Sequence, residues 1–357
     1  MIKMQPSLDV QYTFSYFYQS LKGLFSTTAA VPIGNVFYCN YSRTALRIGL
    51  SSLNLPVNAK VGIMVFNFHT VMNAVIQAGY NIEFIDVTDD LRLDTNDLKL
   101  KHQNLSALVV THLFGLQNDV MAIRSICPQI PIIEDCAHAY LSELNHHQAG
   151  SLGDLATFSI GVAKFPSIGE GGYLRVNNQD YLTAVQNQYN YLSHPSLLTE
   201  LKQIISTFVF GVLYFPLVYR WITLPLKRNQ NTKLQVKMTQ KESIMSRVNY
   251  VRFFHKKNYL VAIKTNRIKR MVELAEALQI EYPTLIIPDL VGSNGFILPC
   301  LSYDRKFLIK TFASKGIEIK PHFADAIQWA QQFGYVLGTC KNAETIVHRI
   351  IVFPTYY

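Results

Sequence analysis

The sequence has few cysteines, and their spacing excludes two kinds of site. There are five, Cys39, Cys127, Cys136, Cys300 and Cys340, with no C-x-x-C. An odd, widely spaced set argues against a disulfide framework and against a zinc site, so we expect no metal. The first residues lack the continuous apolar stretch of a secretory signal. We therefore expect a protein of a reducing cytoplasm.

Two nucleotide-binding motifs are also absent. No G-x-G-x-x-G follows an apolar strand, and no G-x-x-x-x-G-K-[ST] occurs, which removes the main support for dinucleotide-binding and P-loop folds. The net charge of +9 favours an acidic partner, such as an anionic membrane surface or a phosphorylated ligand. The basic residues are scattered and form no long run, so we expect no nucleic-acid partner.

The apolar segments indicate an α/β fold. Strand-like runs alternate with helical periodicity, at residues 61–68, 81–87, 105–111 and 130–135. This alternation is typical of a mostly parallel sheet covered on both faces. We expect a large domain over 1–250, which begins with an aromatic-rich helical arm. A smaller α+β domain should cover 251–357, with strands at 294–302 and 317–323.

The segment 196–228 is an apolar insertion in this pattern. Residues 204–219 carry no charge, but Pro216 and Arg220 interrupt the run before it reaches the roughly 20 residues of a membrane-spanning helix. Basic and aromatic residues flank it, as in interfacial anchors. We expect a helical hairpin that contacts a membrane surface through 199–226. A buried or subunit-facing helical pair is the alternative.

Polar residues at two neighbouring strand ends suggest a ligand site. Asp135 ends one buried strand, Ser159 ends the next, and Lys164 follows five residues later, before a glycine-rich exit at 169–172. In an open α/β sheet, ligands bind outside the carboxyl ends of the strands. We expect these side chains to point into one crevice.

The residue types in that crevice favour a pyridoxal-phosphate (PLP) enzyme. Lys164 lies among small and apolar residues, and a desolvated lysine has a lowered pKa that makes it a Schiff-base nucleophile. Asp135, at a buried strand end, needs a cationic partner, which a protonated pyridine nitrogen supplies. A carboxylate on that nitrogen makes the ring an electron sink.

Other residues suit the phosphate and the ring of this cofactor. Ser42, Arg43 and Thr44 begin a helix-like segment, where free backbone amides favour a phosphate. Taken alone, the hydroxyls fit a helix N-cap better than an anion site, because Ser and Thr are common caps. Ser159 could also hold the phosphate, and Phe68, at another strand end, could stack on the ring.

The run EDCAHAY–GSLGD–ATFSIGVAK–GEGG resembles the DegT/DnrJ/StrS-type sugar aminotransferases, a branch of the fold type I PLP enzymes. The resemblance extends, more weakly, over most of the chain outside the insertion. It implies that Lys164 forms the Schiff base and transfers protons, that Asp135 pairs with the pyridine nitrogen, and that Ser159 binds phosphate. His138 falls where the family usually has glutamine, near the ring hydroxyl.

The sequence departs from the family pattern at two further places. Ser42-Arg43 stands where Gly-Thr is commoner, so phosphate binding should shift to Arg43 and Thr44. Gln235 is the nearest replacement for an asparagine that the partner subunit usually supplies. His322 and Glu170 are expected on the substrate side, although a structural role suits His322 equally.

The resemblance implies transfer of an amino group, usually from glutamate, to a keto-sugar attached to a nucleotide, in surface polysaccharide or related sugar biosynthesis. Relatives with histidine in place of the lysine act as dehydratases, so Lys164 favours transamination. We expect a cytoplasmic homodimer that works at the inner membrane surface. Two alternatives stay open: an idle or regulatory protein with this fold, and another fold type I PLP activity on a membrane-associated substrate.

Overall fold

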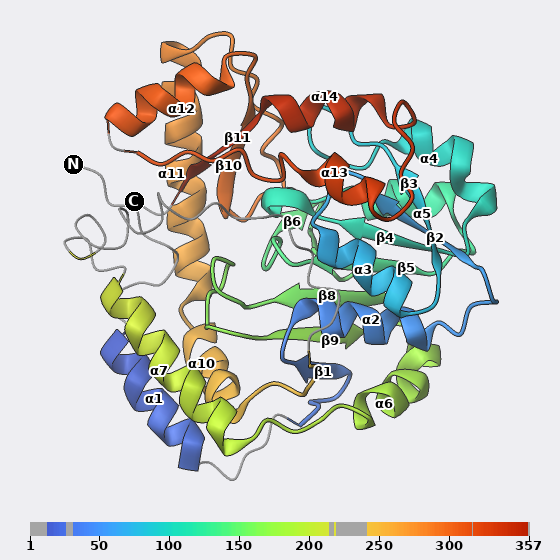
Figure 1. The fold of residues 1–357 in the computed structure, drawn as a ribbon, viewed down its shortest axis with the longest axis vertical. Coiled ribbons are helices and arrows are strands. Elements are labelled where there is room, and N and C mark those ends of the chain that lie inside the picture. The colour runs from blue at the N-terminus through green and yellow to red at the C-terminus, as the bar shows by residue number, and fades with distance from the viewer. Residues whose placement is uncertain (1–12, 26–30, 214–217, 219–240, 316, 356–357) are drawn as a thin grey trace.

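A computed structural model of the chain describes residues 13–25, 31–213, 218, 241–315 and 317–355 (Figure 1). Its centre is a seven-stranded sheet in the order β1-β9-β8-β5-β4-β2-β3. Five strands from β3 to β8 run parallel, and β9 is antiparallel to both of its neighbours. The strands are β1 Val36–Cys39, β2 Lys60–Met64, β3 Asn81–Ile85, β4 Ala107–Thr111, β5 Ile132–Cys136, β8 Leu155–Ser159 and β9 Gly172–Val176. The expected mostly parallel α/β sheet is confirmed.

Helices enclose this sheet because its strands are apolar on both faces. Every residue of β4, β5 and β8 is buried. In Figure 1, α2 and α3 lie in front of the sheet, and α2 packs on β8 and β9. The helices of this part are α2 Ser42–Ser52, α3 His69–Gln77, α4 Thr95–Lys101, α5 Val120–Ile126 and α6 Leu182–Asn190. A short hairpin, β6 Glu143–Leu144 with β7 His147–Gln148, follows β5.

The C-terminal part adds a second, smaller layer. Two antiparallel strands, β10 and β11, have their own apolar core with α11 and α12. Figure 1 shows the long α11 running from α10 to this small sheet. The elements are α10 Arg247–Lys257, α11 Leu260–Glu281, β10 Ile297–Leu301, α12 Arg305–Ser314, α13 Ala326–Gln331, α14 Lys341–Arg349 and β11 Ile350–Pro354. The domain boundary that we expect at residue 250 falls inside α10.

One expected strand of this part does not form. Within 317–323, Lys320 makes an isolated bridge to Val352, and no strand follows. Pro321 has no amide hydrogen for a sheet, and Phe323 has a left-handed φ of 60°. The apolar alternation of IEIKPHF therefore places Phe323 in the core without a strand.

Two helices that are distant in sequence form one edge of the molecule. α1 (Thr13–Phe25) and α7 (Leu197–Leu213) lie side by side against α10 (Figure 1). The expected N-terminal helical arm thus exists within 13–25. α7 covers the first half of the expected hairpin, and residues 214–217 and 219–228 lie outside the described part. None of the described helices is long and apolar enough to cross a membrane.

Candidate active site

A cavity opens where β4, β5 and β8 end, and it collects most of the residues expected there. The side chains from these strand ends, from the start of α2 and from the loop after β8 line it. They include Asp135, His138, Ser159, Lys164, Ser42, Arg43 and Phe68, together with Asn67, Thr111 and Phe323. The convergence follows from topology, since the carboxyl ends of parallel strands share one edge of the sheet.

Asp135 is held in the cavity by neighbours at the ends of strands β4 and β5 and by Asn67 behind Thr111. Its carboxylate accepts hydrogen bonds from the Ala137 amide at 3.1 Å and the Thr111 hydroxyl at 3.4 Å. The Thr111 oxygen itself accepts from Asn67 Nδ2 at 2.8 Å, which leaves its proton for Asp135. Burial raises the pKa of Asp135, while these donors and Lys164 oppose the rise. This support from Asn67 and Thr111 could not be predicted from the sequence, because both residues also suit ordinary strand ends.

Lys164 reaches the cavity from a closed loop. The amide of Val162 donates to the Gly169 carbonyl at 2.8 Å, which joins the two ends of the loop. Ala163 has a left-handed φ of 60°, which turns the chain just before the lysine. Burial lowers the pKa of Lys164 to about 8, and the charge of Asp135 opposes this shift. A neutral amine is therefore accessible close to physiological pH.

His138 contacts that amine directly. Its Nε2 lies 2.6 Å from Lys164 Nζ, and its Nδ1 accepts from the Phe114 amide at 3.2 Å. The imidazole is stacked with the rings of Phe114 and Phe323. Burial, followed by the charges of Lys164 and His322, holds the pKa of His138 well below its usual value. The bond from the Phe114 amide could not be predicted from the sequence, because Phe114 itself has a left-handed φ of 56° in the turn after β4.

The start of α2 forms the opposite end of the cavity. The N-cap is Tyr41, which makes no side-chain capping bond, so Ser42 and Arg43 belong to the first helical turn. The amides of a first turn have no intrahelical acceptor and suit an anion. The Arg43 guanidinium lies over the Tyr41 ring, 3.6 Å from its centre. Thr44 does not line the cavity, and its hydroxyl donates to Asn40 Oδ1 at 2.9 Å.

The remaining expected residues lie around the cavity or outside the described part. The Phe68 side chain is 40% exposed and presents a flat apolar surface on the wall. His322 packs its ring against Phe114 and His138 behind the lining residues. Glu170 accepts from Gln203 Nε2 of α7 at 3.0 Å and does not line the cavity. Gln235 is not among the described residues.

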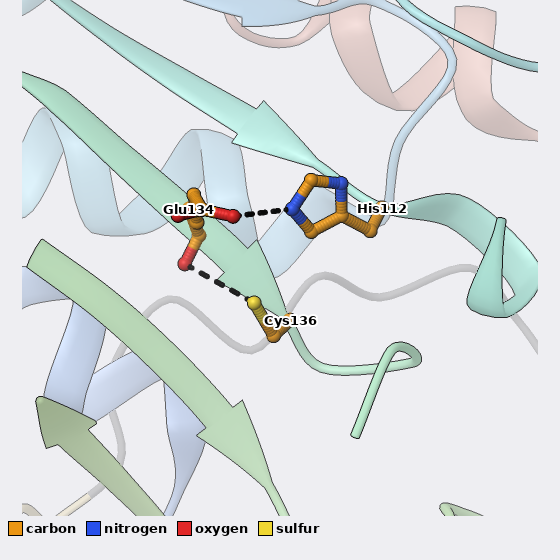
Figure 2. A group of neighbouring side chains, drawn as sticks. All are labelled: His112, Glu134 and Cys136. Atoms are coloured by element: carbon orange, nitrogen blue, oxygen red, sulfur yellow. Dashed lines mark hydrogen bonds and ion pairs between the residues drawn. The ribbon is translucent and has the colours of Figure 1, made fainter. Parts of the chain in front are cut away.

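A second polar cluster lies beneath the site, where His112, Glu134 and Cys136 meet within the sheet (Figure 2). Glu134 Oε2 accepts from His112 Nε2 at 2.9 Å and from the Gly150 amide at 2.7 Å. Its Oε1 accepts from the amides of residues 152 and 153. His112 Nδ1 accepts from the Asn118 amide at 3.0 Å.

Hydrogen-bond donors thus occupy the lone pairs of Glu134 and His112 that a metal ion would need. Burial raises the pKa of Glu134, but the bond from His112 and those from the backbone outweigh it and lower the pKa below its usual value. The charge of Glu134 therefore anchors the GSLGD turn, residues 150–154, to the end of β5. It holds the strand ends that carry Asp135 and Ser159 at a fixed spacing.

The donor set fits PLP. Asp135 is a buried carboxylate that faces a cavity and needs a cationic partner, the Lys164 amine suits a carbonyl carbon, and the start of α2 with Arg43 suits a phosphate. This combination, at the carboxyl edge of a mostly parallel sheet with a smaller C-terminal layer, defines a PLP-dependent transferase of fold type I.

Comparison with known proteins gives the family. Residues 34–207 match the model of the DegT/DnrJ/EryC1/StrS aminotransferase family, and the chain belongs to this family. Its aminotransferases use PLP, so the expected cofactor and enzyme class are confirmed.

Two curated relatives and one solved structure illustrate the match. The chain is 29% identical over 142 residues to GDP-perosamine synthase from Vibrio cholerae. The aligned stretch covers 39% of this chain and 38% of the relative. The chain is 24% identical over 302 residues to UDP-4-amino-4,6-dideoxy-N-acetyl-beta-L-altrosamine transaminase from Campylobacter jejuni, which spans 82% and 72%. The structure of Helicobacter pylori PseC, an aminotransferase involved in the biosynthesis of pseudoaminic acid, has a TM-score of 0.74 at 14% identity and covers 99% of this chain and 93% of that one.

Proposed function

We propose that this protein transfers an amino group from glutamate to the keto group of a nucleotide-linked sugar, in surface polysaccharide or related sugar biosynthesis. The observation that carries the proposal is Lys164 in the cavity beside Asp135. The names of both relatives, which refer to a nucleotide-linked sugar, support this substrate class. The match to the first relative covers 38% of its length, so the activity is argued from the site.

Each residue of the site would have a separate role in such a transfer. When bound, PLP supplies a ring that accepts the electrons of a breaking C–H bond. Asp135 would hold the proton on the ring nitrogen, because its charge opposes loss of that proton. Lys164, as a neutral amine, would take a proton from carbon and return it to another carbon. Ser42, Arg43 and Ser159 would hold the phosphate and so fix the ring, while Phe68 would cover one face of it.

A half-reaction tests this function. The purified enzyme should show the absorbance band of lysine-bound cofactor, and L-glutamate should convert the band while one equivalent of 2-oxoglutarate appears. Lys164→Ala should lack both. Conversion by another amino acid but not by glutamate would overturn the donor, and no conversion by any amino acid would overturn the aminotransferase function in favour of an idle scaffold.

We also propose that the protein binds an anionic membrane surface through α1 and α7, on the cytoplasmic side. The outward side of both helices is apolar, whereas a water-soluble helix normally turns its apolar side to the core. Its members are the exposed residues Phe17, Tyr18, Leu21, Phe25, Leu197, Leu198, Leu201, Ile205, Phe208, Val209 and Val212. We call this set the α1–α7 face. Lys22 and Lys202 are exposed beside it and suit anionic headgroups.

The inward side of the same helices carries several polar residues. Glu200, Gln203 and Thr207 of α7 are all less than 10% exposed, and Ser20 of α1 is fully buried. Arg252 of α10 donates to Ser20 Oγ at 2.8 Å and to Thr207 Oγ1 at 2.9 Å. These bonds fix which side of each helix faces outward, and they favour an apolar environment for the α1–α7 face.

Vesicle flotation tests the membrane proposal. The full chain should float with vesicles that contain phosphatidylglycerol and less with phosphatidylcholine alone. A triple variant, Leu198→Glu, Ile205→Glu and Val212→Glu, replaces one outward stripe and should not float. Ile280→Glu on α11, at a position 82% exposed, is the matched control and should float as the wild type does.

The same variants distinguish a bilayer from a second copy of the chain. We propose a homodimer, as the family resemblance implies, with the α1–α7 face outside its interface. Light scattering should therefore show a dimer for the wild type and for the triple variant. A wild type that does not float, or a triple variant that becomes a monomer, would overturn the membrane proposal.

A further inference from the structure

The hydrogen bonds of His138 fix which of its ring nitrogens carries the proton. Nδ1 accepts the Phe114 amide at 3.2 Å. A nitrogen that accepts a hydrogen bond has no proton of its own, so a neutral imidazole in this place carries its proton on Nε2. That proton then lies between Nε2 and Lys164 Nζ, which are 2.6 Å apart.

The surroundings keep this imidazole neutral and in place. Its ring is 5.8 Å from the Phe323 ring at an interplanar angle of 9°, and 5.0 Å from the Phe296 ring. The side chain is buried, and the charged or titratable groups that act on it are Lys164 and His322. A positive charge on either residue would oppose a positive charge on His138, so the imidazole stays neutral. Its Nε2–H group faces Lys164 Nζ, which must then accept the hydrogen bond.

We propose that His138 is a positioning residue that donates its Nε2 proton to the lone pair of Lys164 and holds the released lysine as a free base. The inference rests on the proposed function in one respect: a transaminase releases its lysine from the cofactor during turnover, and the lysine must then be ready to take a proton. Glutamine, which the family usually has at this position, is also a donor, but its amide can present either its NH2 group or its carbonyl oxygen to the lysine. The imidazole thus adds a directed donor that the turn after β4 orients.

The groups that set the charge of Lys164 come from three parts of the chain. Asp135 at the end of β5 favours the ammonium, while burial opposes it. His138 lies in the turn after β5. His322 comes from the C-terminal part, and burial, followed by the charges of Lys164 and Lys320, lowers its pKa. A donor bond from His138 reinforces the effect of burial, because it stabilises the neutral amine alone.

The test uses the full-length enzyme loaded with pyridoxamine 5′-phosphate, in which Lys164 is free. Reductive methylation of Lys164, read by peptide mass spectrometry near neutral pH, reports its free-base fraction without turnover or a sugar. His138→Phe keeps the ring stack but removes the donor, and His138→Gln keeps a donor. We expect His138→Phe to slow methylation of Lys164 about 3- to 10-fold, the range of one net hydrogen bond, and His138→Gln to stay within about 2-fold.

A measurement on the unaltered chain covers the case in which His138→Phe fails to fold. Nitrogen-15 NMR of labelled histidine should show His138 as the neutral Nε2–H tautomer from weakly acid to weakly alkaline pH. An Nδ1–H tautomer, a protonated ring, or methylation of His138→Phe at the wild-type rate would each overturn the proposal. Since no step needs glutamate or a sugar, failure here is distinguishable from failure of the proposed transamination.

Discussion

Gly172 and Ser42 are in backbone contact at the entrance to the phosphate end of the cavity. A Cβ at position 172 would lie 2.3 Å from the Ser42 amide nitrogen and 2.7 Å from the Phe158 carbonyl oxygen. No side chain fits between backbone atoms at such distances. The last glycine of the GEGG motif therefore allows the start of α2 to approach β9 and β8.

Gly172→Ala should displace the start of α2 and weaken cofactor binding. Because the obstructing atoms belong to the backbone, the variant should also lose about 1–3 kcal/mol of unfolding free energy, as overpacked buried sites do. Gly161→Ala is the matched control, since its Cβ would meet Ser159 Oγ at 3.6 Å, an ordinary contact. Urea unfolding and PLP titration of both variants check this, and equal behaviour would contradict it.

The reactivity of Lys164 should change at a pH well below that of other lysines. Its pKa of about 8 predicts that half of the free side chain is neutral there, whereas exposed lysines reach this point near pH 10.4. Asp135 favours the ammonium, so Asp135→Asn should move the Lys164 midpoint further down. Methylation against pH, read at Lys164, checks the sign. A midpoint that rises in Asp135→Asn would show that the two groups do not interact as described.

Glu134→Gln should destabilise the protein without touching the cavity. The amide nitrogen would replace one acceptor among three backbone amides and His112, which leaves a buried donor facing donors. We expect a loss of about 2–4 kcal/mol, in the range for a charged, buried hydrogen-bond acceptor. Glu143→Gln, at an exposed position of β6, should be neutral. Urea midpoints with equal m-values decide between these outcomes.

Arg252→Met should loosen α1 and α7 together. The guanidinium joins Ser20, Thr207 and Asn249, and its loss leaves their polar atoms buried without this donor. We expect a cost of about 2–4 kcal/mol and faster hydrogen exchange in both helices. Arg270→Met on the exposed side of α11 is the control. Faster exchange in one of the two helices alone would contradict the shared role of Arg252.

Periodicity and motif order predicted the sheet and the positions of Asp135, Ser159 and Lys164, because both depend on local pattern. Buried strands read as apolar runs, and the carboxyl edge of such strands is fixed by topology. The same local logic failed at 317–323, where one proline and one left-handed residue outweigh an alternating pattern. It also placed Thr44 at the phosphate, whereas the helix begins early enough to turn its hydroxyl toward Asn40.

Contacts between distant segments could not be predicted in this way. The bond from the Phe114 amide to His138 joins two turns 24 residues apart, and it depends on a backbone conformation that Phe rarely adopts. The polar side of α7 could not be recognised from its composition. Glu200, Gln203 and Thr207 are few among apolar residues, and their partners on α10 lie some 45 residues further along.

The partners of α7 also determine how much chain makes a folding unit. The stretch that matches the family model ends at residue 207, within α7. A fragment cut there would lack α10, so the backbone amides and side chains that satisfy Glu200 and Gln203 would be missing. Deletion of residues 1–25 would likewise remove Ser20, which accepts a hydrogen bond from Arg252. The smallest autonomous piece of this protein is therefore longer at both ends than the stretch that matches the family model, residues 34–207.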